Sequence, residues 1–267
     1  MQTNEGVKLS EENLSGQNLR GVDLRVAQLS GVDLSDANLE LAKLNGADLS
    51  GADLNDTNLV RADLTGADLC IANLSRAKLS QANLHQASLI SADLISADLK
   101  GACLKTADLR GANLRNANLM GADLRGAKLG RADLSGANLM GANLMGVSLR
   151  NVNLTHVNLR AANLRSADLR AIALGNVNLS NANLSSANLS HGNLQNANLS
   201  NANLRGANLR NTDLRGADLK GADLHGANLD GANLDGADLN DVKFLNPNLT
   251  DTKQSNTRVE KVVLKCN

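Results

Sequence analysis

Leucine occupies every fifth position of this chain from residue 9 to residue 249, with Phe244 as the single exception. The phase of this repeat never shifts, as the segment ADLRGANLRNANLMGADLRG from Ala107 to Gly126 illustrates. A period of five is incompatible with an α-helix, because five residues advance a helix by about 500° and would spread the leucines over every face. The chain is therefore expected to coil as an array of short extended segments separated by bends.

Each five-residue unit has a fixed internal order, which Ala62-Asp63-Leu64-Thr65-Gly66 illustrates. We name its successive slots the alanine, Asx, leucine, outer and corner positions. Side chains alternate along an extended backbone, so the alanine and leucine positions are predicted to face inward and the Asx and outer positions outward. Glycine fills 19 corner positions, which predicts a bend there that needs permissive backbone angles.

The Asx position holds Asp or Asn in 39 of the 49 units, which is too often for a ligand site. A short polar side chain at a bend can accept a hydrogen bond from nearby backbone, and we predict this structural role for the Asx residues. The core must consist of leucine, because the chain has one phenylalanine and neither tyrosine nor tryptophan.

Bulk composition limits the cellular setting. Lysine plus arginine and aspartate plus glutamate number 27 each, so no net charge attracts the chain to an anionic membrane. Cys70, Cys103 and Cys266 have unrelated spacings, which predicts neither a disulfide framework nor a metal knuckle. The first residues lack the apolar stretch of a secretory signal, and no run is long enough to span a membrane. A cytoplasmic protein without a membrane partner is expected.

The pattern Ala-(Asp/Asn)-Leu-X-X over about residues 7–250 resembles the pentapeptide-repeat family. This resemblance implies an all-β fold, a right-handed quadrilateral parallel β-helix, or solenoid, of about twelve four-sided coils with twenty residues in each coil. Residues twenty apart would then stack, and we expect Asn143, Asn163, Asn183 and Asn203 to form a hydrogen-bonded column. The family is abundant in bacteria, so a bacterial source is implied.

The repeat divides the chain into three parts. Residues 1–8 are a lead-in, residues 9–250 are the predicted β-helix, and residues 251–267 are a tail that departs from the repeat. An apolar cluster in this tail is suited either to cap the last coil or to make a dimer contact; it comprises Val259, Val262, Val263 and Leu264. The chain is expected to be a monomer or a homodimer joined through a terminus.

The sequence offers little room for catalysis. Active sites usually lie on loops held out by a scaffold, and a repeat that never breaks phase has no inserted loop. The four histidines fall on different predicted coils, so no two can share a metal ion or activate one nucleophile; they are His85, His156, His191 and His225. We predict a protein that is not an enzyme, with no catalytic residue, metal site or cofactor.

Apolar residues in the usually polar outer positions are the first candidate for a partner surface. Methionine is flexible and polarisable, which suits a binding surface, although isolated exposed apolar residues are common in any protein. Met120 and Met140 are expected to stack on one side of the array. The candidates are Met120, Met140, Met145, Ile90 and Ile95.

Basic residues in outer positions form the second candidate, a surface for anions or an acidic partner. Neighbouring acids weaken this interpretation, because in Asp108-Leu109-Arg110 the two charges flank one leucine and neutralise each other in part. The absence of aromatic side chains for base stacking argues against nucleic acid as the partner. The candidates are Lys100, Lys105, Arg110, Arg115, Arg205, Arg210, Arg215 and Lys220, and a further band lies between them at Arg150, Arg160, Arg165 and Arg170.

The predicted function is a non-enzymatic scaffold, a rigid β-helical rod whose side faces contact a protein partner. The alternative comes from the resemblance alone, since some pentapeptide-repeat proteins mimic duplex DNA and bind DNA gyrase or another topoisomerase. Such mimicry needs a strongly negative surface and usually accompanies central phenylalanines. This chain has balanced charges and leucine in nearly every central position.

Overall fold

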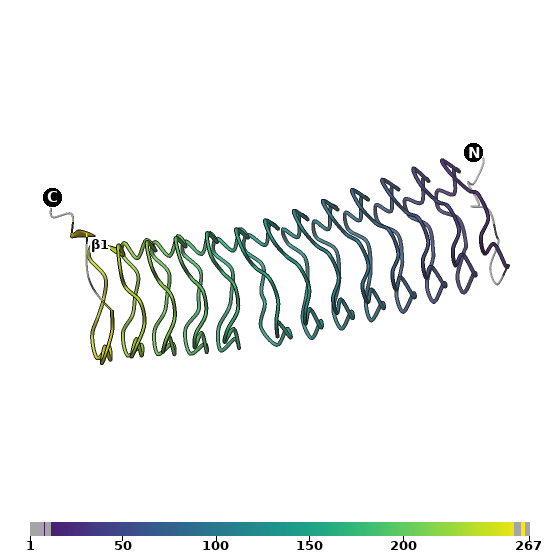
Figure 1. Cartoon of the computed structure of the whole chain (residues 1–267). Coiled ribbons are helices and arrows are strands. Elements are labelled where there is room, and N and C mark those ends of the chain that lie inside the picture. The colour runs from purple at the N-terminus through teal and green to yellow at the C-terminus, as the bar shows by residue number, and fades with distance from the viewer. Residues whose placement is uncertain (1–7, 9–11, 259–262, 265–267) are drawn as a thin grey trace. The chain divides into compact units, whose positions relative to one another are not determined.

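The computed structural model describes residues 8, 12–258 and 263–264. The chain forms two compact units, unit 1 (Met1–Asn138) and unit 2 (Leu139–Asn267). Within each unit the backbone winds through successive coils that lie one over the next (Figure 1). We describe the two units separately.

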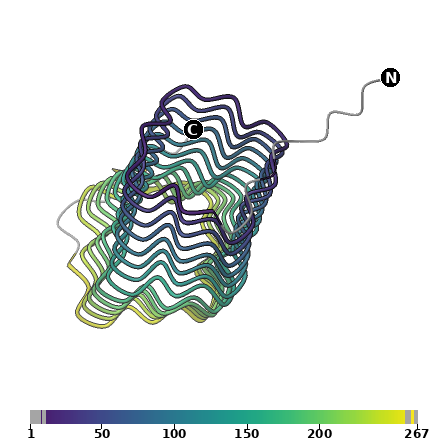
Figure 2. The same cartoon turned by 90° about the vertical axis from the view of Figure 1, so that its right-hand side faces the viewer.

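Neighbouring coils pair in parallel through residues twenty apart, as in Asp33↔Asp53 of unit 1 and Asn163↔Asn183 of unit 2. A bridging residue recurs every five residues and neighbouring coils pair at twenty residues, so each coil contains four five-residue repeats. We call the part of a coil that one repeat forms a side. Viewed along the stack, the coils of each unit repeat the same path (Figure 2). The fold is an all-β parallel solenoid, while its handedness, quadrilateral outline and number of coils stay predictions.

Most sides contribute one bridging residue rather than a strand, because a bend follows only two residues after each Asx position. The two strands that form in the described residues are β1 (Lys243–Phe244) and β2 (Val263–Leu264), which pair in parallel in the same twenty-residue register. Three backbone hydrogen bonds per side join neighbouring coils, and one of them comes from the corner amide, as from Asp36 to the Asn55 carbonyl at 2.9 Å. In unit 1 the Leu34 amide donates to the Asp53 carbonyl at 2.8 Å, and the Asp53 amide donates to the Val32 carbonyl at 2.9 Å.

The leucine and alanine positions face inward, as predicted. From Leu24 to Leu239 every leucine at its repeat position is buried, and so is every alanine at the position two residues earlier. Two inward threonines replace alanine without leaving an unpaired hydroxyl. Thr57 donates to the Leu34 carbonyl at 2.7 Å, and Thr212 donates to the Leu189 carbonyl at 3.0 Å.

Every corner position from 16 to 256 adopts the left-handed backbone conformation, with φ between 51° and 71°. The prediction of a permissive bend is therefore confirmed, and the bend is also imposed on 30 residues that are not glycine. Asn and Asp tolerate this conformation well, whereas β-branched residues adopt it at a cost. Val26 and Ile71 are β-branched and lie at such corners.

The coil continues past the end of the consensus repeat. Lys253 and Arg258 bridge to residues twenty positions earlier, and β2 pairs with β1 in the same way. Thr252 donates to the Leu229 carbonyl at 3.0 Å, as Thr57 does to its own partner. The sequence pattern therefore changes at residue 250, but the pairing between coils continues beyond it. The continuation is not evident from the sequence because Gln254 occupies a position where the repeat has leucine. Val259 and Val262 lie outside the described residues, so the capping and dimerisation roles stay predictions.

Candidate interaction surfaces

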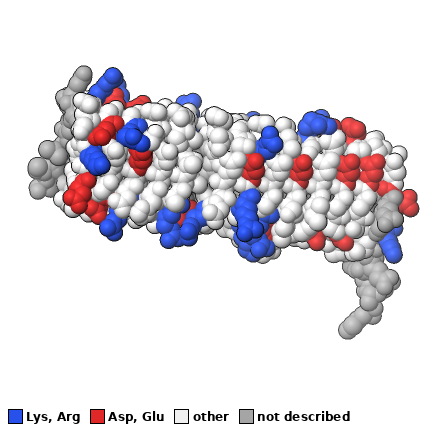
Figure 3. Space-filling model, turned by 90° about the horizontal axis from the view of Figure 1, so that it is seen from below, with Lys and Arg blue, Asp and Glu red and all other residues white. Residues whose placement is uncertain are grey.

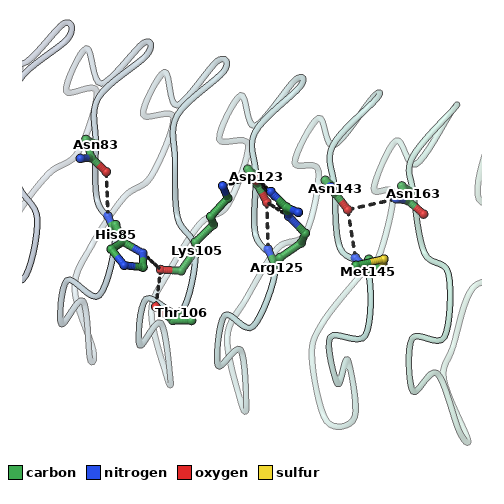
Figure 4. Close-up of polar contacts among 9 residues, drawn as sticks. All are labelled: Asn83, His85, Lys105, Thr106, Asp123, Arg125, Asn143, Met145 and Asn163. Atoms are coloured by element: carbon green, nitrogen blue, oxygen red, sulfur yellow. Dashed lines mark hydrogen bonds and ion pairs between the residues drawn. The ribbon is translucent and has the colours of Figure 1, made fainter.

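Asx side chains stabilise the bends, which confirms their predicted structural role. The Asp63 Oδ1 atom accepts hydrogen bonds from the Thr65 amide at 3.1 Å and from the Thr65 hydroxyl at 2.6 Å. Asn163 donates to Asn143 Oδ1 at 3.1 Å, as the predicted column requires (Figure 4). Asn183 instead accepts from the amide and hydroxyl of Ser185. The Asx residues are thus occupied within the fold.

The predicted apolar partner surface falls in both units. Ile90, Ile95 and Met120 are half-buried in unit 1. In unit 2, Met140 is half-buried and Met145 is 39% exposed. The predicted stacking of Met120 on Met140 joins residues of different units and stays a prediction.

Corner positions carry the apolar residues that sequence reasoning overlooked. Ile71 is 74% exposed and has a φ of 61°, and Val26 and Leu41 are also exposed at corners. The Ile71 amide donates to the Ile90 carbonyl at 3.0 Å, so Ile90 lies on the coil directly after it. The residue one coil earlier is Gly51, which offers Ile71 no side chain to pack against. The signal in the sequence was an isoleucine in a position that glycine and asparagine usually fill.

Cys70 adjoins this exposed isoleucine. Its Sγ lies 2.9 Å from the Ser88 hydroxyl, and burial raises the pKa of the Cys70 thiol. A raised pKa keeps the sulfur protonated, so Cys70 acts as a small half-buried apolar residue. We call Cys70, Ile71 and Ile90 the Ile71 patch.

Most of the predicted basic surface is neutralised by neighbouring aspartates. Arg110 and Arg215 each form an ion pair with the Asx residue of their own five-residue repeat. The guanidinium-to-carboxylate distances to Asp108 and Asp213 are 2.7 Å. The hydrogen bonds from Arg110 lower the pKa of Asp108, and those from Arg215 lower the pKa of Asp213 to about 2. Three more of the candidates bind aspartates of the following coil: Lys105 to Asp123, Arg205 to Asp223 and Arg210 to Asp230.

Figure 4 shows one such carboxylate, Asp123, which two basic side chains contact. Asp123 accepts from Arg125 at 2.7 Å and lies 3.4 Å from Lys105 Nζ, and hydrogen bonds from Arg125 lower its pKa. The remaining candidates, Lys100, Arg115 and Lys220, have no ion pair within the described part of the chain. The same holds for Arg150, Arg160 and Arg165 of the intermediate band. The unpaired cations are therefore a subset of the predicted basic residues.

Two of the four histidines make local contacts within the solenoid. His85 Nδ1 lies 3.0 Å from the Lys105 carbonyl oxygen, and His225 contacts the Asp223 carboxylate. Among residues 8, 12–258 and 263–264, no group of three His, Cys, Asp or Glu side chains could hold a metal ion. No helix in this part of the chain is long and apolar enough to cross a membrane.

Charge is distributed unevenly along the sequence in spite of its zero net value. Residues 139–212 contain six arginines and one acidic residue, Asp168, whereas residues 213–241 contain seven aspartates and two basic residues. Figure 3 shows both acidic and basic groups on one face, in places side by side, with neutral surface elsewhere. The zero net charge of the whole chain gives no sign of this uneven distribution.

Inward leucines, bends every five residues and a twenty-residue parallel register define a β-solenoid repeat protein. The family model described as pentapeptide repeats (8 copies) matches residues 5–36, 33–69, 72–111, 102–141, 182–221 and 217–253, and the model of a pentapeptide repeat region matches residues 129–199. The chain belongs to the pentapeptide-repeat family.

Several solved structures are similar to this chain. HetL, a pentapeptide repeat protein involved in heterocyst differentiation regulation in the cyanobacterium Nostoc sp. strain PCC 7120, is 39% identical over 85% of this chain and 89% of its own, with a TM-score of 0.36. A trypsin-treated form of QnrB1, a plasmid-mediated fluoroquinolone resistance protein, is 21% identical over 83% and 89%, with a TM-score of 0.31. A pentapeptide repeat protein from the Arabidopsis thaliana thylakoid lumen is 39% identical over 39% and 69%, with a TM-score of 0.24. No curated protein matches the chain.

Proposed function

We propose that this protein is a non-enzymatic scaffold that binds a protein partner through residues displayed on the outside of its coils. The inward positions are nearly uniform and serve the fold alone. The outer and corner positions vary, so they are where a binding specificity can be encoded. The Ile71 patch carries this proposal.

The left-handed backbone conformation of Ile71 lowers the stability of the fold, and its side chain offsets little of that loss. A non-glycine residue in the left-handed region costs roughly 1–2 kcal/mol, and the cost is greatest for bulky or β-branched residues. Ile71 recovers little of that cost through burial, because 74% of it is exposed. Strained residues are concentrated at functional sites, and exposed isoleucine beside half-buried Ile90 provides apolar area for a protein contact.

The alternative function, DNA mimicry with gyrase or another topoisomerase as partner, has weaker support. A mimic of duplex DNA must present negative charge along its length. Residues 139–212 have a net charge of +5, from six arginines and one aspartate. Several aspartates elsewhere are neutralised by arginine, as in the Asp108–Arg110 pair. The charge distribution therefore favours the scaffold.

The proposal is tested by affinity capture on three immobilised forms of the full chain. Ile71→Asn removes the apolar side chain and keeps a residue suited to the corner. Gln81→Asn is the matched control, because Gln81 is an exposed corner residue with a φ of 59°. We expect a bound protein to be retained by the wild type and by Q81N and lost from I71N. Identical capture by all three forms would exclude the Ile71 patch as the partner surface.

A further inference from the structure

Unpaired cations occur in both units, and in unit 2 several of them lie within residues 139–212. Three of the six arginines in residues 139–212 are neutralised: Arg170 by Asp168, Arg205 by Asp223 and Arg210 by Asp230. The other three, Arg150, Arg160 and Arg165, are exposed and form no ion pair with any described residue. Besides the hydrogen bonds from Arg170, Arg150 helps to lower the pKa of Asp168, so Arg160 and Arg165 are the two without an aspartate nearby. These two residues lie one repeat apart, at the outer positions of adjoining sides.

The absence of acidic neighbours explains why these two arginines are unpaired. Elsewhere an arginine commonly binds the aspartate two residues before it, as Arg170 binds Asp168 at 2.6 Å. On the two sides that carry Arg160 and Arg165, every Asx position from 143 to 203 is instead asparagine: Asn143, Asn158, Asn163, Asn178, Asn183, Asn198 and Asn203. Asparagine cannot neutralise a guanidinium, so both cations remain available to an external anion.

The surface beside these arginines is open and partly apolar. Gly141 and Gly146 donate their amides to the carbonyls of Arg160 and Arg165, each at 2.9 Å, so the glycines lie one coil before the arginines. A Cβ atom added at either glycine would meet nothing within 4 Å. Met145 is 39% exposed at the outer position one coil before Arg165, and its amide donates to Asn143 Oδ1 at 3.2 Å (Figure 4). The two arginines thus lie beside the exposed Met145 and beside two corners that carry no side chain.

We propose that Arg160, Arg165 and Met145 form a docking surface for an extended acidic polypeptide that carries an apolar side chain near its carboxylates. This proposal rests on the scaffold function and names the chemistry of a partner. The arginine fork binds carboxylates through two parallel hydrogen bonds, and the methionine adapts to an apolar side chain. Carboxylates two to four residues apart in an extended segment are about 7–14 Å apart, a spacing that two long side chains on adjoining sides can reach.

A polypeptide fits this surface better than nucleic acid does. Single-stranded nucleic acid is generally held by stacking its bases on aromatic side chains, and the chain has only Phe244, which is buried. Duplex binding relies on many phosphate contacts, whereas this surface offers two unpaired arginines. Met145 gives an apolar contact that a phosphate backbone would not use.

The test is a fluorescence anisotropy titration of the full chain with a labelled peptide of four Asp-Leu-Glu repeats. The variant R160S/R165S introduces the serine found at the same positions one coil later, Ser180 and Ser185, so the coil accommodates it. The control K100S/R115S removes two unpaired cations from unit 1 and introduces the serine of the equivalent positions Ser80 and Ser135. Circular dichroism verifies that both variants remain folded.

We expect R160S/R165S to weaken peptide binding at least tenfold and K100S/R115S to change it less than twofold. A Met145→Asn variant should weaken binding severalfold, and a peptide of Asn-Leu-Gln repeats should not bind. Equal weakening by both double variants would overturn the proposal, because it would show a response to overall charge. Tighter binding of a 20-base-pair DNA, lost in R160S/R165S, would overturn it in favour of nucleic acid. Failure of the scaffold function is distinguishable, since I71N affects partner capture and leaves this peptide titration unchanged.

Discussion

The amide nitrogen of Ile71 donates a hydrogen bond to the carbonyl oxygen of Ile90, 3.0 Å away on the next coil. This bond is part of the regular ladder, and it holds Ile71 at a corner with a φ of 61°. The ladder thus places an isoleucine in a conformation that suits glycine or asparagine. An apolar side chain results that is 74% exposed.

Relief of this strain should stabilise the protein. We expect Ile71→Asn to raise the free energy of unfolding by about 1 kcal/mol, because asparagine adopts the left-handed conformation more readily. Urea denaturation followed by circular dichroism measures the change. Q81N is the control, with an expected change below about 0.5 kcal/mol. A destabilised I71N variant would mean that Ile71 packs productively against its neighbours.

A charge introduced into the leucine stack should disrupt unit 1. Leu119 is fully buried, so Leu119→Asp would place a carboxylate among leucines without a partner. We expect a loss of more than about 4 kcal/mol, seen as a large fall in melting temperature. Leu249→Asp is the matched control in unit 2, because Leu249 is 39% exposed and should tolerate the change better. An unchanged melting temperature for L119D would contradict the inward assignment.

Loss of a surface ion pair should matter little. Arg110 contacts Asp108 through Nε at 2.8 Å and Nη2 at 2.7 Å, and its side chain is 56% exposed. Exposed ion pairs are weak because solvent screens them, so Arg110→Ala should leave the melting temperature nearly unchanged. The effect should shrink further in 1 M salt. A large fall in melting temperature would show that Arg110 packs against the coil.

The Asp213–Arg215 pair should add an acid-sensitive contribution to stability. Hydrogen bonds from Arg215 lower the pKa of Asp213 from 3.8 to about 2 in the folded protein. The folded state therefore binds this proton less readily, so the contribution is present above pH 3.8 and disappears as the pH falls towards 2. We expect wild type and Asp213→Asn to differ by about 1 kcal/mol at pH 6, a typical value for a surface pair, and to converge near pH 2.

Urea denaturation of both proteins between pH 6 and pH 2 measures this convergence. Asp251→Asn is the control, because Asp251 is an exposed corner residue without an ion pair in the described part of the chain. A difference between wild type and D213N that stays constant with pH would disprove the link to protonation.

The segment after residue 250 should stabilise the end of unit 2. A chain that stops at residue 250 loses the bridges of Lys253 and Arg258 to the preceding coil, and with them the hydrogen bonds that these bridges contain. We expect a lower melting temperature for the truncated chain. Light scattering coupled to size exclusion then separates the two roles of the tail. If a dimer becomes a monomer on truncation, the tail is a dimerisation element. If the number of chains in the assembly is unchanged, the tail is a cap.

The sequence by itself determined the course of the backbone. Leucine in constant phase requires a bend in every unit, and the alternation of side chains then sets which positions are buried. Asp63 illustrates how far this reasoning extends, since its hydrogen bonds to Thr65 follow from local spacing alone. These features are local and identical in every unit, so a one-dimensional pattern is sufficient to predict them.

The tertiary structure decided which outward residues pair across coils. The pairing of Arg170 with Asp168 follows from the local sequence, whereas Arg165 follows an asparagine and stays unpaired because the adjacent coils also present asparagine. Arg205 is neutralised by Asp223, eighteen residues later and adjacent only because coils pair at twenty residues. Exposure and charge pairing depend on what the neighbouring coil presents. The register between coils therefore determines the surface, while the repeat within the chain determines the core.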